Sequence, residues 1–136
     1  MLKRLSIIIL LAGVFVCSVA AITTVSPART NAGWIVAANS ADLSGCESLV
    51  AAVSGKSIVV DYMVVNTDTA LNVTIGEGET TGAVTTWKTP PLYLPANGFV
   101  IVPCPPGGMK LTAASALTID ASGAGNVSVY AWGRYI

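Results

Sequence analysis

The sequence contains no histidine. A Ser-His-Asp triad, a Cys-His dyad and any zinc site with a histidine ligand are therefore excluded. Cys46 and Cys104 alone cannot complete a structural zinc set, and the glycine-rich stretch GEGETTG lacks the lysine of a Walker phosphate loop. We therefore expect no catalytic residue, no cofactor and a chain that is not an enzyme.

Charge is also scarce, since only 10% of the 136 residues are charged whereas 53% are hydrophobic. A chain this apolar is not expected to be disordered. Seven Lys and Arg balance seven Asp and Glu, so the chain lacks the basic surface that binding to nucleic acid requires. The length predicts one domain, and nucleic acid is not expected as a partner.

The N-terminal segment differs in composition from the rest of the chain. Lys3 and Arg4 precede an uncharged apolar run, Leu5–Ile22, which ends in small residues at the spacing that signal peptidase recognises. Residues 1–21 are therefore predicted to be a signal peptide or a retained apolar anchor helix, with membrane contact through residues 3–22 in the second case. Both alternatives predict a protein that is exported (secreted, periplasmic or at the surface) or membrane-anchored.

Cysteine usage agrees with export. Cys17 lies in the N-terminal segment, which leaves Cys46 and Cys104. An even number of cysteines in an exported chain predicts a disulfide between them, which would contribute roughly 4 kcal/mol in the chain-entropy model. The alternative is two separate buried thiols.

Beyond the N-terminal segment, short strands are the dominant pattern. Residues 22–48 are interrupted by Pro27 and Gly33 and are expected to form an irregular N-terminal arm. Over residues 49–136, short β-type runs recur about every ten residues with turn formers between them. This pattern predicts an all-β fold, a single jelly-roll-like β-sandwich over residues 49–136.

Two neighbouring runs carry more specific expectations. SIVVDYMVV (Ser57–Val65) is largely apolar on both faces, which predicts a central strand covered on both sides. The polar NTDT turn follows it, and then the alternating run ALNVTIGE, so the two runs are expected to pair as a hairpin. FVIVP (Phe99–Pro103) is expected to be a short strand that CPPGG terminates.

Acidic residues are weak candidates for chemistry. Glu77 and Glu79 share a face of an extended chain, but two carboxylates on one loop face solvent more readily than they frame a sugar. Calcium bound by this loop, with Asp68 or Asp61 as a further ligand, is the alternative.

Aromatic residues are the stronger candidates for binding. Exposed, aligned aromatic rings can form a platform for sugars, whereas alternation with small residues in VSVYAWGRYI is equally typical of a strand that packs against another subunit. Four residues are therefore candidate contacts for a ligand or a subunit: Trp87, Tyr93, Tyr130 and Trp132.

The order of motifs from residue 49 to the C-terminus is also distinctive. LVAAVSGKSIVVDYMVVN is followed by LNVTIGEG, LYLPANGFVIVPCPPGG and LTAASALTIDASGAGNVSVYAWGRY. This order resembles the small β-sandwich or jelly-roll virion structural proteins of bacteriophages, in which a GKxIxVxxxxV strand leads to VTxxxG, LPANGGxVxP and a TAxGxAL turn. The resemblance covers about two-thirds of the chain and implies a decoration, fibre or minor capsid module that forms oligomers. It carries over no catalytic residue.

The export signal departs from that resemblance. It implies either a cellular, secreted protein or a virion with a membrane. We therefore expect a non-enzymatic structural or assembly protein, a self-associating module of a virion, appendage or cell-surface layer, whose partners are copies of itself or other structural subunits. The alternative is a secreted carbohydrate- or surface-binding module that uses its exposed aromatic residues.

Overall fold

Alternation of apolar and polar residues produces strands and no helices in the part of the chain that the computed structural model describes, residues 33–40, 45–80 and 83–136. The strands are β1 (Gly33–Ser40), β2 (Glu47–Val50), β3 (Ile58–Thr67), β4 (Leu71–Thr80), β5 (Ala83–Trp87), β6 (Leu92–Leu94), β7 (Phe99–Ile101), β8 (Met109–Lys110), β9 (Leu117–Ala121) and β10 (Val127–Tyr135).

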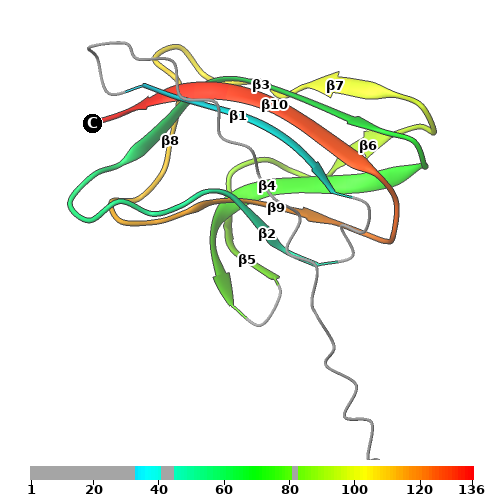
Figure 1. The fold of residues 1–136 in the computed structure, drawn as a ribbon, viewed down its shortest axis with the longest axis horizontal. Coiled ribbons are helices and arrows are strands. Elements are labelled where there is room, and N and C mark those ends of the chain that lie inside the picture. Colours follow the sequence, from blue (N-terminus) through cyan, green and yellow to red (C-terminus); the bar gives the residue numbers. More distant parts are fainter. Residues whose placement is uncertain (1–32, 41–44, 81–82) are drawn as a thin grey trace, which may run out of the picture.

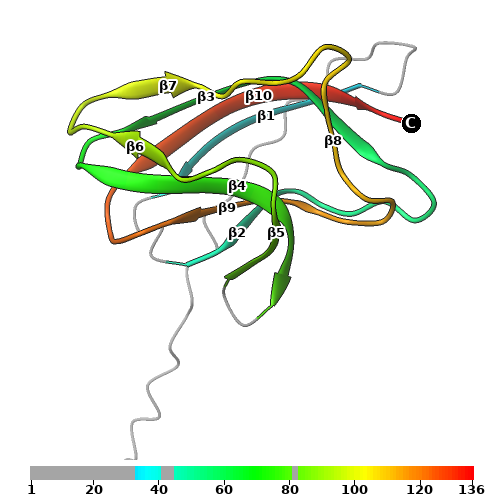
Figure 2. The ribbon, with the colours of Figure 1, turned by 180° about the vertical axis from the view of Figure 1, so that it is seen from behind.

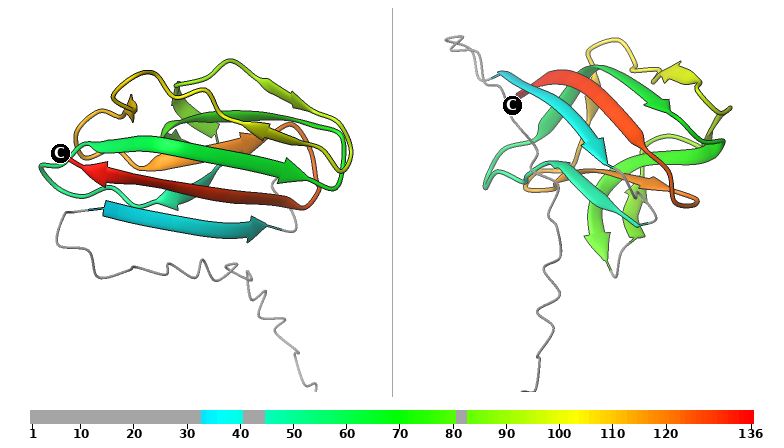
Figure 3. Two further views of the ribbon diagram at one scale, coloured as in Figure 1. Left: turned by 90° about the horizontal axis from the view of Figure 1, so that it is seen from above. Right: turned by 45° about the vertical axis from the view of Figure 1, so that its right-hand side comes forward.

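The strands form two antiparallel sheets that face each other (Figure 1). Sheet A has the order β1-β10-β3-β7, and β8 pairs with β3 as well. Sheet B has the order β2-β9-β4-β5, and β6 also pairs with β4. Figure 2 shows the two layers from behind, and Figure 3 shows β10 between β1 and β3. The expected all-β sandwich is confirmed.

The hydrophobic core lies between the two sheets. Its fully buried side chains come from both layers and include Val60, Met63, Val65, Val73, Ile75, Leu117 and Ile119. Complete burial of one such side chain contributes about 1.5–3 kcal/mol. The interleaved branched side chains of the two layers therefore hold the sandwich together.

The sandwich begins earlier in the chain than expected. Within the range expected to be an irregular arm, β1 pairs along its whole length with β10, and β2 pairs with β9. Trp34 and Val36 place apolar side chains in the core, which is why this uncharged segment adds to the sheet. The predicted signal or anchor segment, residues 1–21, lies outside the described residues. Within those residues, no helix has the length and apolarity to cross a bilayer.

The expected hairpin of β3 and β4 is wrong, because the two strands belong to different sheets. The turn between them is a corner that carries the chain from sheet A to sheet B. The Asp68 carboxylate accepts hydrogen bonds from the Thr69 hydroxyl (2.8 Å) and the Asn126 backbone N–H (2.9 Å). Asn126 lies in the turn where the chain crosses back from β9 to β10, so the two corners are tied together.

Where β10 pairs with β3, the backbone at Gly133 lies very close to β3 and to the Trp34 side chain. The register shifts between Trp132 and Gly133, where β3 holds one extra residue. A Cβ atom at Gly133 would lie 1.9 Å from the Val59 carbonyl oxygen and 2.6 Å from the Trp34 indole. Only glycine allows the strands and the buried Trp34 ring to approach this closely.

Candidate functional site

The four candidate aromatic residues divide between the two sheets. Tyr130 and Trp132 project from β10 on the outer face of sheet A, because their neighbours Val129 and Ala131 point into the core. Trp87 ends β5 and Tyr93 lies in β6, both on sheet B. The structure therefore brings Tyr130 and Trp132 together and keeps Trp87 and Tyr93 away from them.

Sheet A assembles a compact aromatic cluster. Trp132 lies directly opposite Tyr62 in the β10–β3 ladder, and their rings stack with centroids 4.2 Å apart and an angle of 17° between the planes. Tyr130 meets Trp132 edge to face, with centroids 5.7 Å apart. The two stacked rings turn their faces toward each other, since their separation is close to the spacing of neighbouring strands. Their edges therefore point to solvent.

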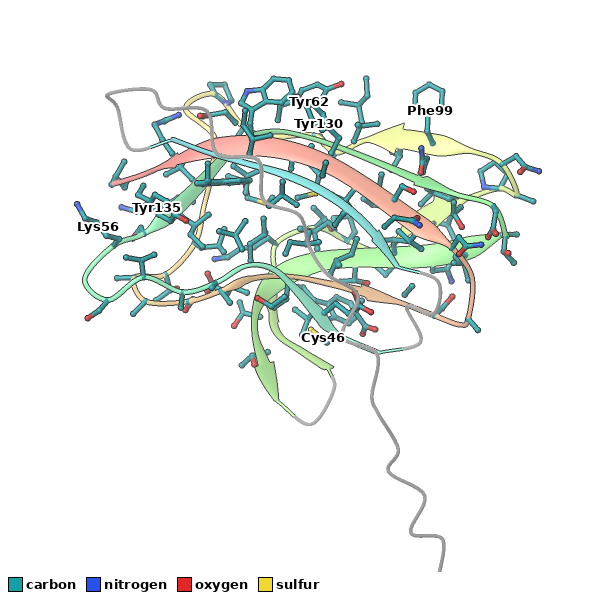
Figure 4. The ribbon with its side chains drawn as sticks, in the orientation of Figure 1. Cys46, Lys56, Tyr62, Phe99, Tyr130 and Tyr135 are labelled. Carbon is teal, nitrogen blue, oxygen red and sulfur yellow. The ribbon has the colours of Figure 1, made fainter. Side chains whose placement is uncertain are left out.

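Neighbouring strands extend this cluster into a continuous surface. Cross-strand partners point to the same side of a sheet, and the ladder pairs Ile35 with Trp132, Ala37 with Tyr130, Val64 with Tyr130 and with Ile101, and Asn66 with Phe99. Figure 4 shows Tyr62, Tyr130 and Phe99 projecting from sheet A on the side away from sheet B. We call this surface the apolar face and define it by Ile35, Ala37, Tyr62, Val64, Phe99, Ile101, Tyr130 and Trp132.

The apolar face is substantially open to water. Phe99 is 70% exposed, Ile101 53%, Tyr130 45% and Trp132 38%. The largest apolar patch of a protein is often a contact surface, which makes this face a candidate for binding another molecule. The central position predicted for β3 is confirmed, but within the described residues its second face, with Tyr62 and Val64, belongs to this exposed surface.

Polar groups close both ends of the apolar face. At one end the Ser128 hydroxyl donates to the Asn39 side chain (2.8 Å). At the other end Arg134 pairs with the Asp61 carboxylate and donates to the Gly107 carbonyl (2.7 Å). No residue of the face itself is charged, and at this end Lys110 of β8 lies in register with Val59 and Arg134, beside the Arg134–Asp61 pair. Such a polar boundary around an apolar centre is typical of a contact surface.

The outer face of sheet B is different. Its ladder pairs Thr74 with Asp120 and Asn72 with Tyr93, so polar side chains alternate with exposed aromatic rings, Tyr93 and also Trp87, which pairs with Gly76. The two sheets thus share a core but differ outside, because the exposed rings of sheet A contact one another whereas Trp87 and Tyr93 of sheet B lie among polar residues. The apolar face is therefore a specific property of sheet A.

Tyr93 lies beside a shallow hollow on sheet B. The hollow has a volume of about 480 Å³ and is lined by Leu71, Asn72, Tyr93, Pro95 and Ser122 among others. Tyr93 is the most exposed large apolar side chain described, at 78%. An exposed ring with an amide and a hydroxyl nearby is the arrangement here that most resembles a small-ligand site.

Hydrogen bonds and an ion pair within the fold hold the side chain of Glu77. Its carboxylate is almost fully buried and accepts hydrogen bonds from the Thr112 backbone N–H (2.6 Å) and hydroxyl (2.7 Å), and it contacts the Lys88 ammonium at 3.1 Å. Burial by itself raises the pKa of Glu77, but the hydrogen bonds from Thr112 and Lys88 outweigh burial and lower the pKa below its usual value. The carboxylate joins three segments and is not arranged to transfer a proton. The side chain of Glu79 lies outside the described part.

The other acidic candidates also have protein partners. Asp61 pairs with Arg134. Hydrogen bonds from the Asn126 side chain, and then from Thr69, lower the pKa of Asp68. Over residues 33–40, 45–80 and 83–136, no three acidic or cysteine side chains come together as a metal site. The calcium site considered from the sequence therefore has no ligand set in this part of the molecule.

The predicted disulfide is not present, since the structure does not join Cys46 to Cys104. Cys46 is buried next to β2 of sheet B but outside the main core cluster, whereas Cys104 follows β7 of sheet A and packs against that cluster. Burial raises the pKa of the Cys104 thiol, a hydrogen bond with the Met109 backbone lowers it, and the Asp61 carboxylate raises it further; the net shift is upward. A raised pKa disfavours the thiolate, so Cys104 is not arranged as a nucleophile.

Sequence reasoning missed part of the apolar face. Phe99 and Ile101 were not candidate contacts, although they are its two most exposed side chains. The sequence did offer one indication of this surface. Ser57–Val65 is largely apolar on both faces, so both faces of β3 are expected to be buried against other residues.

Comparison of the chain with protein-family models yields no match, and neither does comparison with curated proteins. What the molecule does must therefore be inferred from its own surfaces.

Proposed function

We propose that this chain is a non-enzymatic structural protein, a self-associating β-sandwich module of a virion, appendage or cell-surface layer. The observation that carries the proposal is the contrast between the two outer faces. Sheet A gathers exposed aromatic and aliphatic side chains into one cluster, whereas sheet B presents mostly polar side chains, with Trp87 and Tyr93 among them. A module with one face of this kind gains stability when that face is covered in an assembly.

The strand order supports the same proposal. β5 and β6 both pair with β4, and β7 and β8 both pair with β3, so each couple acts as one interrupted strand. If each couple counts as one strand and the strands are renumbered from 1 to 8 along the chain, sheet A has the order 1-8-3-6 and sheet B the order 2-7-4-5. Eight strands in two such sheets fit a jelly roll, an architecture used by capsid proteins and by lectins.

We further propose that the chain reaches its site of assembly by export. The basis is the sequence alone, in which Lys3 and Arg4 precede an uncharged apolar run. N-terminal sequencing of native material distinguishes a cleaved signal peptide, with a new terminus near Ala21 or Ile22, from a retained anchor that keeps Met1.

A carbohydrate- or surface-binding module is the second candidate, and the hollow beside Tyr93 favours it. A sugar ring stacks on the face of an aromatic ring. On sheet A the stacking of Tyr62 on Trp132 occupies one face of each ring, so the apolar face is a poor platform for sugars. Any glycan site is therefore expected at Tyr93.

Light scattering on the full chain during size-exclusion chromatography tests the first candidate against the second. Self-association predicts a mass that rises with concentration to a multiple of 13.8 kDa. A constant monomer mass, together with a change in fluorescence when glycans are added, would instead favour the binding module.

A further inference from the structure

We propose that a second copy of this chain covers the apolar face, with sheet A of one molecule stacked on sheet A of the other around a two-fold axis that runs parallel to the strands. This inference depends on the proposed function, because it specifies the surface through which the module self-associates. Three properties of the face support it: its charge, its area and its distribution of large and small side chains.

The charge distribution suits an identical partner. A two-fold interface brings the same patch of both molecules together, with residue i against residue j and j against i, so a patch with a net charge of one sign would repel its copy. The apolar face contains no charged residue, and Arg134 at its margin is already paired with Asp61. Two copies can therefore approach without repulsion. A strongly charged partner would find no complementary group on this face.

The area suits a weak pair. An aromatic side chain can bury 150–250 Å², so the four most exposed side chains of the face leave roughly 400 Å² in water. With the half-buried Ile35, Tyr62 and Val64 and the polar ends, the face reaches roughly 600 Å² for each copy, or about 1,200 Å² for the pair. That value is at the lower end of specific interfaces. We therefore expect a reversible pair whose population rises with protein concentration.

The two margins of the face complement each other. The β7 margin carries the large, protruding Phe99 and Ile101, whereas the β1 margin carries the smaller Ala37 and Asn39. Rotation about an axis parallel to the strands places β7 of one copy over β1 of the other. Ile101 then lies over Ala37 of the second copy, and Trp132 lies over its Tyr62. An axis across the strands would instead place the large residues of β7 over one another and the small residues of β1 over one another, which leaves the two margins unevenly filled.

Charge insertion tests the face. We expect Ile101→Lys to raise the dissociation constant of the pair at least about tenfold, because two lysines would be buried near the contact. Tyr93→Lys on sheet B is the matched control and should leave association unchanged. Both side chains are more than half exposed, so both variants should fold, which circular dichroism and thermal melting can verify.

Disulfide trapping tests the axis. Ala37 and Ile101 lie on strands separated by three strand spacings, about 14 Å, which no disulfide within one molecule can span. Under mild oxidation the full-length double variant Ala37→Cys/Ile101→Cys should form a covalent dimer, and neither single variant should.

The outcomes separate this inference from the proposed function. Self-association that Ile101→Lys and Tyr93→Lys leave equally intact would overturn the inference and leave the proposed function standing. Covalent dimers of the Ile101→Cys single variant would overturn the axis. A link from that cysteine to Cys17 would show that residues 5–22 cover the face and would also overturn the inference. Wild-type protein that stays monomeric at high concentration would refute both proposals.

Discussion

Replacement of Gly133 by alanine is expected to lower the free energy of unfolding by about 3 kcal/mol or more, which corresponds to a fall in Tm of about 10 °C or more. The new Cβ would lie 1.9 Å from the Val59 carbonyl oxygen, a backbone atom that cannot move without displacing β3. It would also lie 2.6 Å from the Trp34 ring, which is buried beneath β10. Urea or thermal unfolding of Gly133→Ala beside the wild type measures the effect.

Gly123→Ala is the matched control for this substitution. A Cβ at Gly123 meets only a Leu71 methyl group, at an ordinary contact distance of 3.7 Å. Its unfolding free energy should therefore stay within about 0.5 kcal/mol of the wild-type value. Equal stability of the two variants would contradict the close approach of β10, β3 and Trp34 described above.

Replacement of Glu77 by glutamine is expected to destabilise the sandwich by about 2–3 kcal/mol. The amide retains the shape of the carboxylate but turns an NH₂ group toward donors that now bond to oxygen, the Thr112 N–H or hydroxyl and the Lys88 ammonium. The buried side chain of Glu77 cannot turn to water, so the mismatched bonds are replaced only in part, through the exposed Thr112 and the partly exposed Lys88. Chemical unfolding at neutral pH measures the loss, and Asp120→Asn on β9 is the control carboxylate, with an expected change of about 0.5 kcal/mol or less.

The same carboxylate makes stability depend on pH. Because folding lowers the pKa of Glu77, its contribution is present above the unfolded value, near 4.5, and is lost as pH falls through the lower folded value. The wild type should therefore lose unfolding free energy in acid, and Glu77→Gln should lose less over the same range. Parallel pH profiles for the two proteins would show that Glu77 does not carry this dependence.

The strands were largely predictable from the sequence because their alternation is local. Residues 58–67 and 127–135 form long strands where β-branched runs indicate them. The assignment of strands to sheets was not predictable in the same way. Alternation shows that a strand has an inner face but not which sheet it joins, so the corner at Asp68 was taken for a hairpin. That β1 belongs to sheet A was missed because β10, the strand with which it pairs, lies about ninety residues away in the sequence.

The candidate site was predictable only in part, and for a related reason. Tyr130 and Trp132 stand out because they alternate with small residues in one segment. Phe99 and Ile101 join them only through the pairing of β3 with β7, a register that no local pattern specifies. The disulfide between Cys46 and Cys104 was inferred by counting cysteines, and counting carries no information on whether two cysteines lie within bonding distance.

One sequence expectation connects the fold with the function. A run that is apolar on both faces predicted a β3 covered on both sides. Sheet B covers its inner face, and in the described structure the outer face contributes Tyr62 and Val64 to the apolar face. The proposed self-association would supply the second cover that the sequence of β3 indicates.

The central claim is that the apolar face becomes covered when molecules assemble, and hydroxyl-radical footprinting with mass spectrometry tests it most directly. The oxidation rate of each side chain reports its exposure and can be followed as the full chain is concentrated. We predict that Phe99, Tyr130 and Trp132 become protected at high concentration, whereas Trp87 and Tyr93 stay as reactive as in dilute solution. Protection confined to Tyr93 and Trp87, or unchanged oxidation of Phe99 and Trp132 at every concentration, would contradict the account.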